Sequence, residues 1–179
     1  NLVLYDAKDL VATGGQHNDP NVDGTKILMI ANKSSVSGLG TAQKFKSNAT
    51  ITVPAYSYAV ISLWVRTDNL KTKAIGKTPG AYVLISDKVA STDYKGIELT
   101  EINTNSTWKR IETVIKGSDF ASSTFTKTLG LGRGNGTFTS DYVEGYAFFD
   151  NVQATVYSKE DYDALNKTVT FDKVEKSQE

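Results

Sequence analysis

The run from Tyr142 to Val156 is aromatic and β-branched along most of its length, yet it contains one carboxylate, Asp150, followed by Asn151. Asp and Asn are disfavoured in β-strands, so their place in a run that otherwise predicts a strand needs a physical cause. A carboxylate in a core strand requires a bound cation, a network of N–H donors, or a β-bulge that turns it outward. Under each explanation Asp150 is a fixed point of the fold.

Residues 56–67 form the strongest predicted strand, because their apolar and polar side chains alternate with a period of two. The alternation predicts one core face and one amphipathic face. The core face consists of Ile61, Leu63 and Val65, and the amphipathic face of Tyr58, Ser62, Trp64 and Arg66. Residues 26–31 contain a continuous apolar run, which predicts a strand buried on both faces.

About nine to eleven short strands, separated by turn residues, precede Tyr157, and no helical period occurs among them. This pattern predicts an all-β fold, an antiparallel β-sandwich of the jelly-roll type. A chain of 179 residues supplies one full core, so we expect one module over residues 1–157. Ser158 can cap a helix, and we expect residues 158–179 to form a short helical or linker tail that joins other domains of a larger parent protein.

Charge and composition exclude several partners. The chain has 20 basic and 20 acidic side chains and no stripe of Lys or Arg, which argues against nucleic acid. No apolar run approaches the roughly 18 residues of a membrane-spanning helix, so we expect no membrane insertion. Cysteine is absent, which leaves a hard cation as the expected type of metal. A start at Asn1 without Met, in a Thr- and Asn-rich chain, is typical of a processed, secreted module, and we expect an extracellular or cell-surface location.

The sequence does not predict an enzyme. Glycoside hydrolysis needs two carboxyl groups across a cleft, and a pair stays open because four acids lie on predicted strands. These acids are Glu98, Glu101, Glu112 and Glu144. Charged residues on the wet face of a sheet are the ordinary explanation. The one histidine, His17, lies in a predicted loop, and no Gly-x-Ser-x-Gly motif occurs.

Four motifs follow one another in a recognisable order: Gly24-Thr-Lys-Ile-Leu-Met-Ile30, Tyr58 to Thr67 with its Trp-Val-Arg-Thr ending, Thr107-Trp-Lys-Arg-Ile-Glu112, and Phe148-Phe-Asp-Asn-Val152. Together they resemble the β-jelly-roll carbohydrate-binding modules of families 4, 9 and 22, within the galactose-binding-like architecture. The resemblance extends over residues 1–157. It implies non-catalytic binding of a polysaccharide or another glycan.

The resemblance also implies a structural Ca²⁺ ion. In the family, an Asp in the closing strand, here Asp150, joins an acidic residue near the N-terminus and backbone carbonyls around the metal. Asp6 is the nearest match to that residue and Asp9 the second, although the usual Phe-Glu pair of the first strand is missing here. The alternative is a metal-free Asp150 that accepts hydrogen bonds from backbone N–H groups.

Sugar sites of the family lie on the concave sheet or at the loop tips, where aromatic rings stack on sugar rings and planar polar groups bind hydroxyls. The expected ligand-binding residues are those on the non-core strand faces: Trp64, Arg66, Tyr82, Arg110, Glu112, Tyr146 and Phe148. Two alternatives stay open. Several of these side chains could instead pack under loops or in a second layer, and the module could serve as an adhesion or spacer module that makes protein contacts. Exposure of Trp64 and Tyr146 favours sugar, and burial of both favours a spacer.

Overall fold

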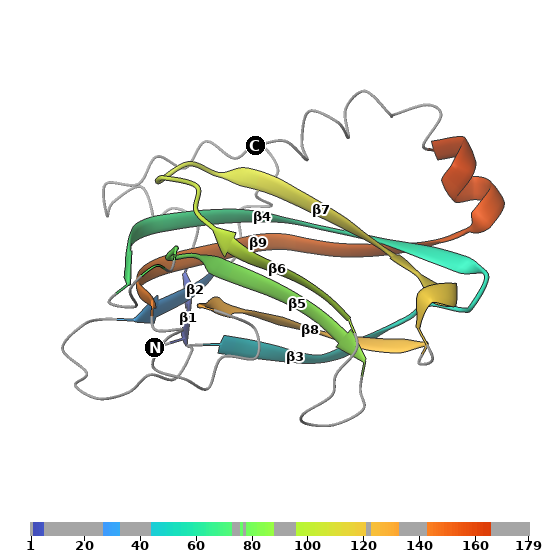
Figure 1. Cartoon of the computed structure of the whole chain (residues 1–179), viewed down its shortest axis with the longest axis horizontal. Helices are drawn as coiled ribbons and strands as arrows, with labels where there is room; N and C mark the ends of the chain where they lie inside the picture. The colour runs from blue at the N-terminus through green and yellow to red at the C-terminus, as the bar shows by residue number, and fades with distance from the viewer. Residues whose placement is uncertain are drawn as a thin grey trace.

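The computed structural model describes residues 2–5, 27–32, 44–72, 76, 78–87, 96–120, 123–132 and 143–165. Within these ranges, nine strands form two sheets that pack face to face (Figure 1). The strands are β1 (Leu2–Tyr5), β2 (Ile27–Asn32), β3 (Lys44–Thr52), β4 (Ser57–Thr72), β5 (Ala81–Asp87), β6 (Gly96–Ile102), β7 (Lys109–Lys116), β8 (Thr124–Leu131) and β9 (Val143–Ser158), with a 3₁₀ turn, η1 (Gly117–Asp119), after β7. A short helix follows over residues 159–165.

One sheet has the strand order β1-β2-β9-β4-β7 and the other the order β3-β8-β5-β6. All the strand pairs are antiparallel. The two longest strands, β4 and β9, have 16 residues each and pair from Ser57–Ser158 to Thr72–Val143. The predicted all-β antiparallel sandwich is therefore confirmed.

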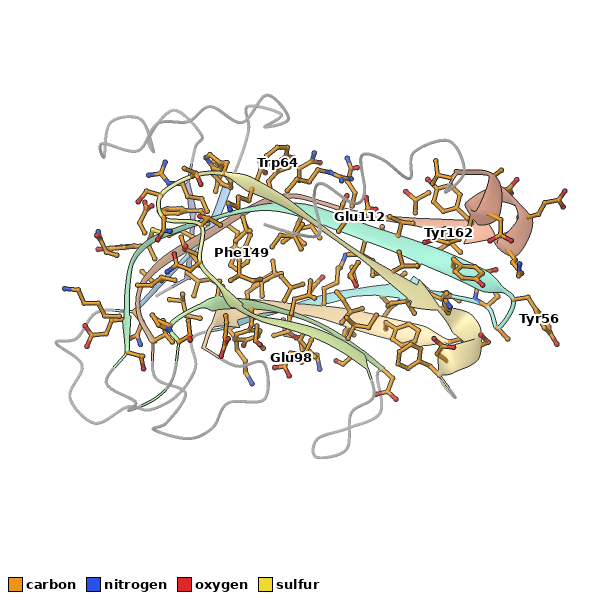
Figure 2. The ribbon with its side chains drawn as sticks, turned by 45° about the horizontal axis from the view of Figure 1, so that its top comes forward. Tyr56, Trp64, Glu98, Glu112, Phe149 and Tyr162 are labelled. Carbon is orange, nitrogen blue, oxygen red and sulfur yellow. The ribbon has the colours of Figure 1, made fainter. Side chains whose placement is uncertain are left out.

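The main core fills the space between the two sheets. Ile61, Leu63 and Val65 of β4 are buried there, as their alternation predicted. They face Val83, Ile85, Phe125 and Leu129 of the four-stranded sheet. Figure 2 shows Phe149 of β9 between the two layers.

Strand β2 is buried on both faces, which confirms the prediction from its continuous apolar run. Ile30 belongs to the main core. Ile27, Met29 and Ala31 form a second cluster with Phe148, and Trp108 and Tyr146 pack against it. The second cluster lies on the outer face of the five-stranded sheet, because successive side chains of a strand point to opposite faces.

A β-bulge explains the two anomalous residues of β9. Trp64 pairs with Asp150 and Ser62 with Gln153, so two residues of β9 stand opposite Leu63 alone. The inserted residue Asn151 has a φ of 48°, in the left-handed region that Asn tolerates better than most residues. Asp150 lies two residues after Phe148, so its side chain points to the same outer face, away from the main core. It is nevertheless only 7 % exposed.

A second bulge lies at the other end of the same strand pair. Asp68 pairs with Tyr146 and Lys71 with Glu144, and Asn69 has a φ of 54°. Opposite it, Gly145 has a φ of 123°, and a Cβ atom there would lie 2.6 Å from the carbonyl oxygen of Asn69. Only glycine fits this position.

The helix over residues 159–165 is capped and attached to the sandwich. Ser158 Oγ accepts a hydrogen bond from the backbone N–H of Asp161 at 3.1 Å, as a helix N-cap does. The ring of Tyr162 stacks on Tyr58 of β4, with 4.6 Å between centroids and 2° between planes. No helix in the described part of the chain is long and apolar enough to cross a membrane. The boundary between module and tail stays a prediction.

We predict that Asn151→Gly changes the free energy of unfolding little, whereas Asn151→Val lowers it by about 1–2 kcal/mol, because a β-branched residue is strained at positive φ. Both variants lose the bond that Asn151 Oδ1 accepts from Gln153 Nε2 at 2.9 Å, so their difference isolates the backbone. Urea denaturation measures both free energies. Equal stability of the two variants would refute the bulge.

Candidate functional site

Six of the seven predicted ligand-binding residues lie on three neighbouring strands of the five-stranded sheet. Trp64 of β4 pairs with Arg110 of β7, and Arg66 of β4 pairs with Phe148 of β9. Glu112 pairs with Ser62, and Tyr146 with Asp68. The strands are thus neighbours, which is the condition for one continuous strip of side chains.

Tyr82 does not belong to this strip. It lies on β5, in the four-stranded sheet, and its side chain is fully buried. Its neighbours Ala81 and Val83 belong to the main core, so Tyr82 faces the opposite side of that sheet. A ligand cannot reach its ring in this structure.

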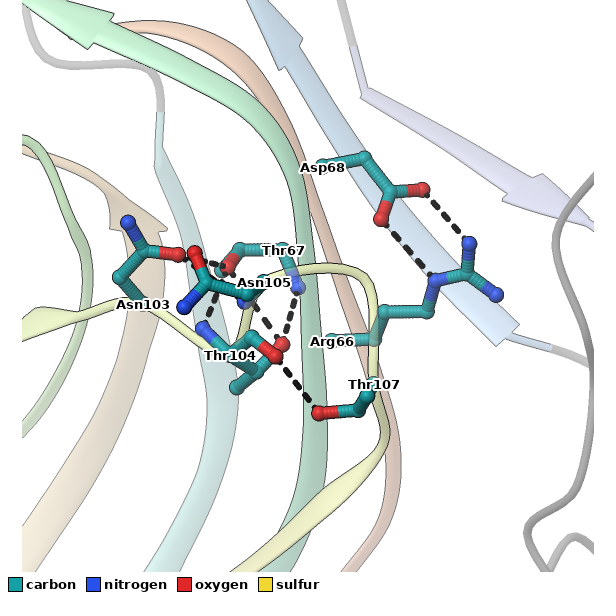
Figure 3. Close-up of polar contacts among 7 residues, drawn as sticks. All are labelled: Arg66, Thr67, Asp68, Asn103, Thr104, Asn105 and Thr107. Atoms are coloured by element: carbon teal, nitrogen blue, oxygen red, sulfur yellow. Dashed lines mark hydrogen bonds and ion pairs between the residues drawn. The ribbon is translucent and has the colours of Figure 1, made fainter. Parts of the chain in front are cut away.

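The part of the strip nearest β9 is packed. Arg66 is 4 % exposed and Phe148 5 %. The Arg66 guanidinium donates to both carboxylate oxygens of Asp68, at 3.1 Å from Nε and 3.0 Å from Nη2 (Figure 3). It also lies 6.0 Å from the centroid of the Phe148 ring, on which Tyr146 stacks at 6.4 Å. These side chains pack in a second layer, on the outer face of the five-stranded sheet, which is one of the alternatives that the sequence left open.

The rest of the strip borders a cleft of about 940 Å³ between β6 and β7, the edge strands of the two sheets. The chain has two tryptophans, and both line this cleft, half-buried. The lining residues are Trp64, Trp108, Lys109, Arg110, Ile111 and Glu112 from β4, β7 and the turn before β7, and residues 98–104 from β6 and the start of that turn. Figure 2 shows Trp64 and Glu112 on one layer of the sandwich and Glu98 on the other.

An ion pair lies on the β7 side of the cleft. Arg110 Nη1 is 3.1 Å from Glu112 Oε2, and both side chains are partly exposed. Arg110 and Glu112 are two residues apart on one strand, so they share a face. The pair presents planar donors and acceptors beside Trp64, a combination suited to sugar hydroxyls above an aromatic ring.

The turn between β6 and β7 is clamped to β4 by hydrogen bonds that sequence reasoning missed (Figure 3). The backbone N–H of Thr104 donates to Thr67 Oγ1 at 2.8 Å, and that of Thr67 donates to Thr104 Oγ1 at 2.9 Å. Thr67 Oγ1 donates to Asn103 Oδ1 at 3.2 Å. Thr67 and Thr104 are 1 % and 3 % exposed. These hydrogen bonds form a clamp that fixes the end of the cleft where Trp108 lies, directly before β7 begins.

The turn itself has an unusual backbone. Asn105 and Ser106 both have positive φ, at 49° and 65°. Its conformation is held because the N–H of Ser106 donates to the Thr67 carbonyl at 2.9 Å and the N–H of Asn105 to Asn103 Oδ1 at 3.1 Å. A Thr pair 37 residues apart carries no recognisable signal in one sequence.

The described residues do not by themselves form a calcium site. Asp150 is a buried carboxylate, but no group of three or more His, Cys, Asp or Glu in the described ranges could hold a metal ion. Asp6 and Asp9, the expected N-terminal ligands, lie outside those ranges, as does His17. The calcium prediction therefore stays a prediction.

We predict that Thr104→Val lowers the free energy of unfolding by about 1–3 kcal/mol, because it leaves the buried N–H of Thr67 without its acceptor while keeping the side chain's volume. The control is Thr52→Val, since Thr52 is exposed on β3 and its variant should unfold within about 0.5 kcal/mol of wild type. Chemical denaturation measures both. A Thr104→Val protein as stable as the control would show that the clamp contributes nothing.

The sequence matches no family model and no curated protein. Solved structures do match the fold. A family 4 carbohydrate-binding module aligns with 87 % of this chain and 86 % of its own, at 13 % identity and a TM-score of 0.51. A cyclase from Fischerella sp. TAU aligns over 88 % and 75 % of the two chains, at 10 % identity and a TM-score of 0.51.

A third similar structure is the enzymatically active domain of tailspike protein 4 of bacteriophage CBA120. It aligns with 88 % of this chain and 18 % of its own, at 13 % identity and a TM-score of 0.50. Likenesses at such identities show the fold alone. The chain therefore has the β-jelly-roll fold that carbohydrate-binding modules share.

Proposed function

We propose that the protein is a non-catalytic carbohydrate-binding module that holds a polysaccharide in the cleft between β6 and β7. The observation that carries the proposal is the position of Trp64 and Trp108, which line one open cleft beside the Arg110–Glu112 pair. Aromatic faces with a few convergent polar groups are the usual chemistry of a site for a small, partly apolar ligand.

Binding divides between stacking and hydrogen bonding. The indole rings pack against the apolar C–H faces of sugar rings, and the Arg110 guanidinium keeps donors for hydroxyl oxygens beyond the bond to Glu112. Three carboxylates and two cations line the cleft: Glu98, Glu101, Glu112, Lys109 and Arg110. The excess of negative charge favours a neutral glycan over a polyanionic one.

The proposed absence of catalysis rests on the chemistry of the carboxylates. Glu112, one of the carboxylates that line the cleft, is engaged in an ion pair with Arg110. The family 4 neighbour is a carbohydrate-binding module, whereas the cyclase and the tailspike domain are enzymes, so the fold does not decide between the two classes. An extracellular or cell-surface location and a multidomain parent belong to the same proposal.

An adhesion or spacer module is the second candidate. The burial of Arg66 and Phe148 favours it, because these side chains are packed and not available to a ligand. Trp64 and Tyr146 are both half-buried, which lies between the two expectations. The two tryptophans that line the cleft favour carbohydrate binding over the adhesion or spacer module.

We predict that Trp64→Ala weakens binding of a neutral polysaccharide at least tenfold, with the free energy of unfolding lowered by no more than about 2 kcal/mol. The loss follows from removal of the stacking surface. The control is Tyr56→Ala, because Tyr56 is 89 % exposed and does not line the cleft. Affinity gel electrophoresis against plant and microbial polysaccharides, followed by calorimetry, measures both. Undiminished binding by the Trp64→Ala variant would show that the cleft is not the binding site. If the wild-type protein bound no polysaccharide, the adhesion or spacer module would remain as the candidate function.

We also propose that Asp150, with Asp6, binds Ca²⁺ in a structural role, as the family resemblance implies. A hard cation held by a buried carboxylate stabilises the folded state in proportion to its differential binding. We predict a higher thermal midpoint in millimolar Ca²⁺ than in EDTA for wild type, and no difference for Asp150→Asn. Scanning calorimetry in the two buffers measures the midpoints. A wild-type midpoint that is the same in both would disprove the metal.

A further inference from the structure

Among the described strands, β9 has no partner on one side along its second half. Strand β4 pairs with β9 along its length, whereas β2 pairs with it only from Gly145 to Phe149. No other described strand pairs with β9. Residues 151–157 therefore have backbone N–H and C=O groups that point away from β4 and reach no described strand. We call this segment the free edge.

The sequence of the free edge lacks the residue types that usually protect an unpaired strand. Its sequence is Asn151-Val-Gln-Ala-Thr-Val-Tyr157 and contains no charged residue, no proline and no glycine. Its bulge lies at its first residue, Asn151. Natural edges are commonly blocked by Lys, Pro or a covering element, and an uncharged β-branched edge is a template for pairing with another strand. The free edge is thus suited to strand addition.

Exposed apolar side chains gather at the same place. Beyond the bulge, Ala154 pairs with Ile61 and Val156 with Ala59, so the side chains of Val152, Ala154 and Val156 are directed toward the inner face. Val152 is 36 % exposed and Val156 43 %. Phe45 of β3 is 37 % exposed and lines a pocket of about 140 Å³ together with Val152. Three of the four exposed large apolar side chains of the described part thus lie on or beside the free edge.

The free edge is complementary to itself. The inner-facing residues read Val, Ala, Val, which is the same in both directions. In an antiparallel pair of two copies related by a two-fold axis at Ala154, Val152 of each copy stands opposite Val156 of the other. On the outer face, Gln153 stands opposite Thr155. No charge meets a like charge across the axis, and cross-strand Val pairs are favourable.

We propose that the free edge pairs with the same edge of a second copy of this chain, giving a symmetric dimer with the two-fold axis at Ala154. The proposal does not depend on the ligand. The free edge lies on the side of β9 away from β4, whereas the cleft is lined by β4, β7 and β6, so both clefts of the dimer remain open. A dimer would thus present two weak sites to one polysaccharide chain, and their joint affinity would exceed that of one site. Seven paired residues make a small interface, so the dimer forms at micromolar or higher concentration.

Cysteine cross-linking tests the position of the axis directly, because the chain contains no cysteine. Residues opposite each other in an antiparallel pair have Cβ atoms about 5 Å apart, close enough for a disulfide after small adjustment. The full-length Ala154→Cys variant, oxidised at 100 μM, is expected to give a covalent dimer of twice 19.5 kDa. Tyr56→Cys, exposed and far from the axis, is the matched control and should cross-link at least tenfold more slowly. Equal rates would overturn the proposal.

Introducing a charge at the axis supplies the second test. Ala154→Lys and Ala154→Glu each place like charges opposite one another at the axis, and each should weaken self-association at least tenfold in sedimentation velocity. An equimolar mixture should restore association, because Lys then stands opposite Glu. Tyr56→Lys and Tyr56→Glu should associate as wild type does, and circular dichroism checks that all four variants fold. A wild-type chain that stays at 19.5 kDa up to 1 mM, or a mixture that restores nothing, would refute the dimer.

Discussion

The structure depends on the antiparallel pairing of β4 with β9. Strand β7 attaches to β4 and β2 attaches to β9, so the five-stranded sheet is built outward from this pair. A strand's side chains alternate between faces, and one extra residue therefore reverses the inside and outside of all that follows. The bulge at Asn151 uses this property. It lets β9 direct Phe149 into the main core before the bulge and Ala154 toward the inner face after it.

The cleft is a consequence of where the two sheets end. Strands β6 and β7 are edge strands among those described, and their side chains are mostly half-buried because no further described strand covers them. The space between them is kept open by the turn that joins them, which the Thr67–Thr104 bonds hold against β4. Beside the cleft, the packed part of the strip, in which Arg66 contacts Asp68 and Phe148, holds the sheet that carries Trp64. A stiff sheet and a fixed turn reduce the entropy that a bound chain would otherwise have to offset.

Much of this fold could be predicted from local patterns. Alternation in residues 56–67 predicted the core face of β4, and the misplaced Asp150 and Asn151 pointed to a bulge as one of three causes. The site could be predicted only in part. Periodicity assigns a side chain to a face but not to a sheet, so Tyr82 could not be separated from the six residues of the other sheet. Nor could it show that Phe148 is buried in a second apolar cluster, since that cluster depends on contacts between distant segments.

The cleft and the clamp were beyond the reach of sequence patterns. The cleft requires the knowledge that β6 and β7 are the edges of two different sheets, and strand order is a property of the whole topology. The pairing of the two threonines depends on the same topology. The Trp64 and Trp108 motifs were visible in the sequence, but their meeting at one edge was not.

The long ladder between β4 and β9 also determines how the molecule would carry mechanical load. When tension on the C-terminal end of β9 is directed along the strand axis, it acts parallel to β4. Many hydrogen bonds of the ladder are then loaded together in shear, and no single pair can open first as in a zipper. The registers on either side of the two bulges must slip in concert, because Asn151 and Asn69 lock the strands at separate points. A module held by this end would thus withstand tension while its cleft, on the far side of β4, keeps its shape.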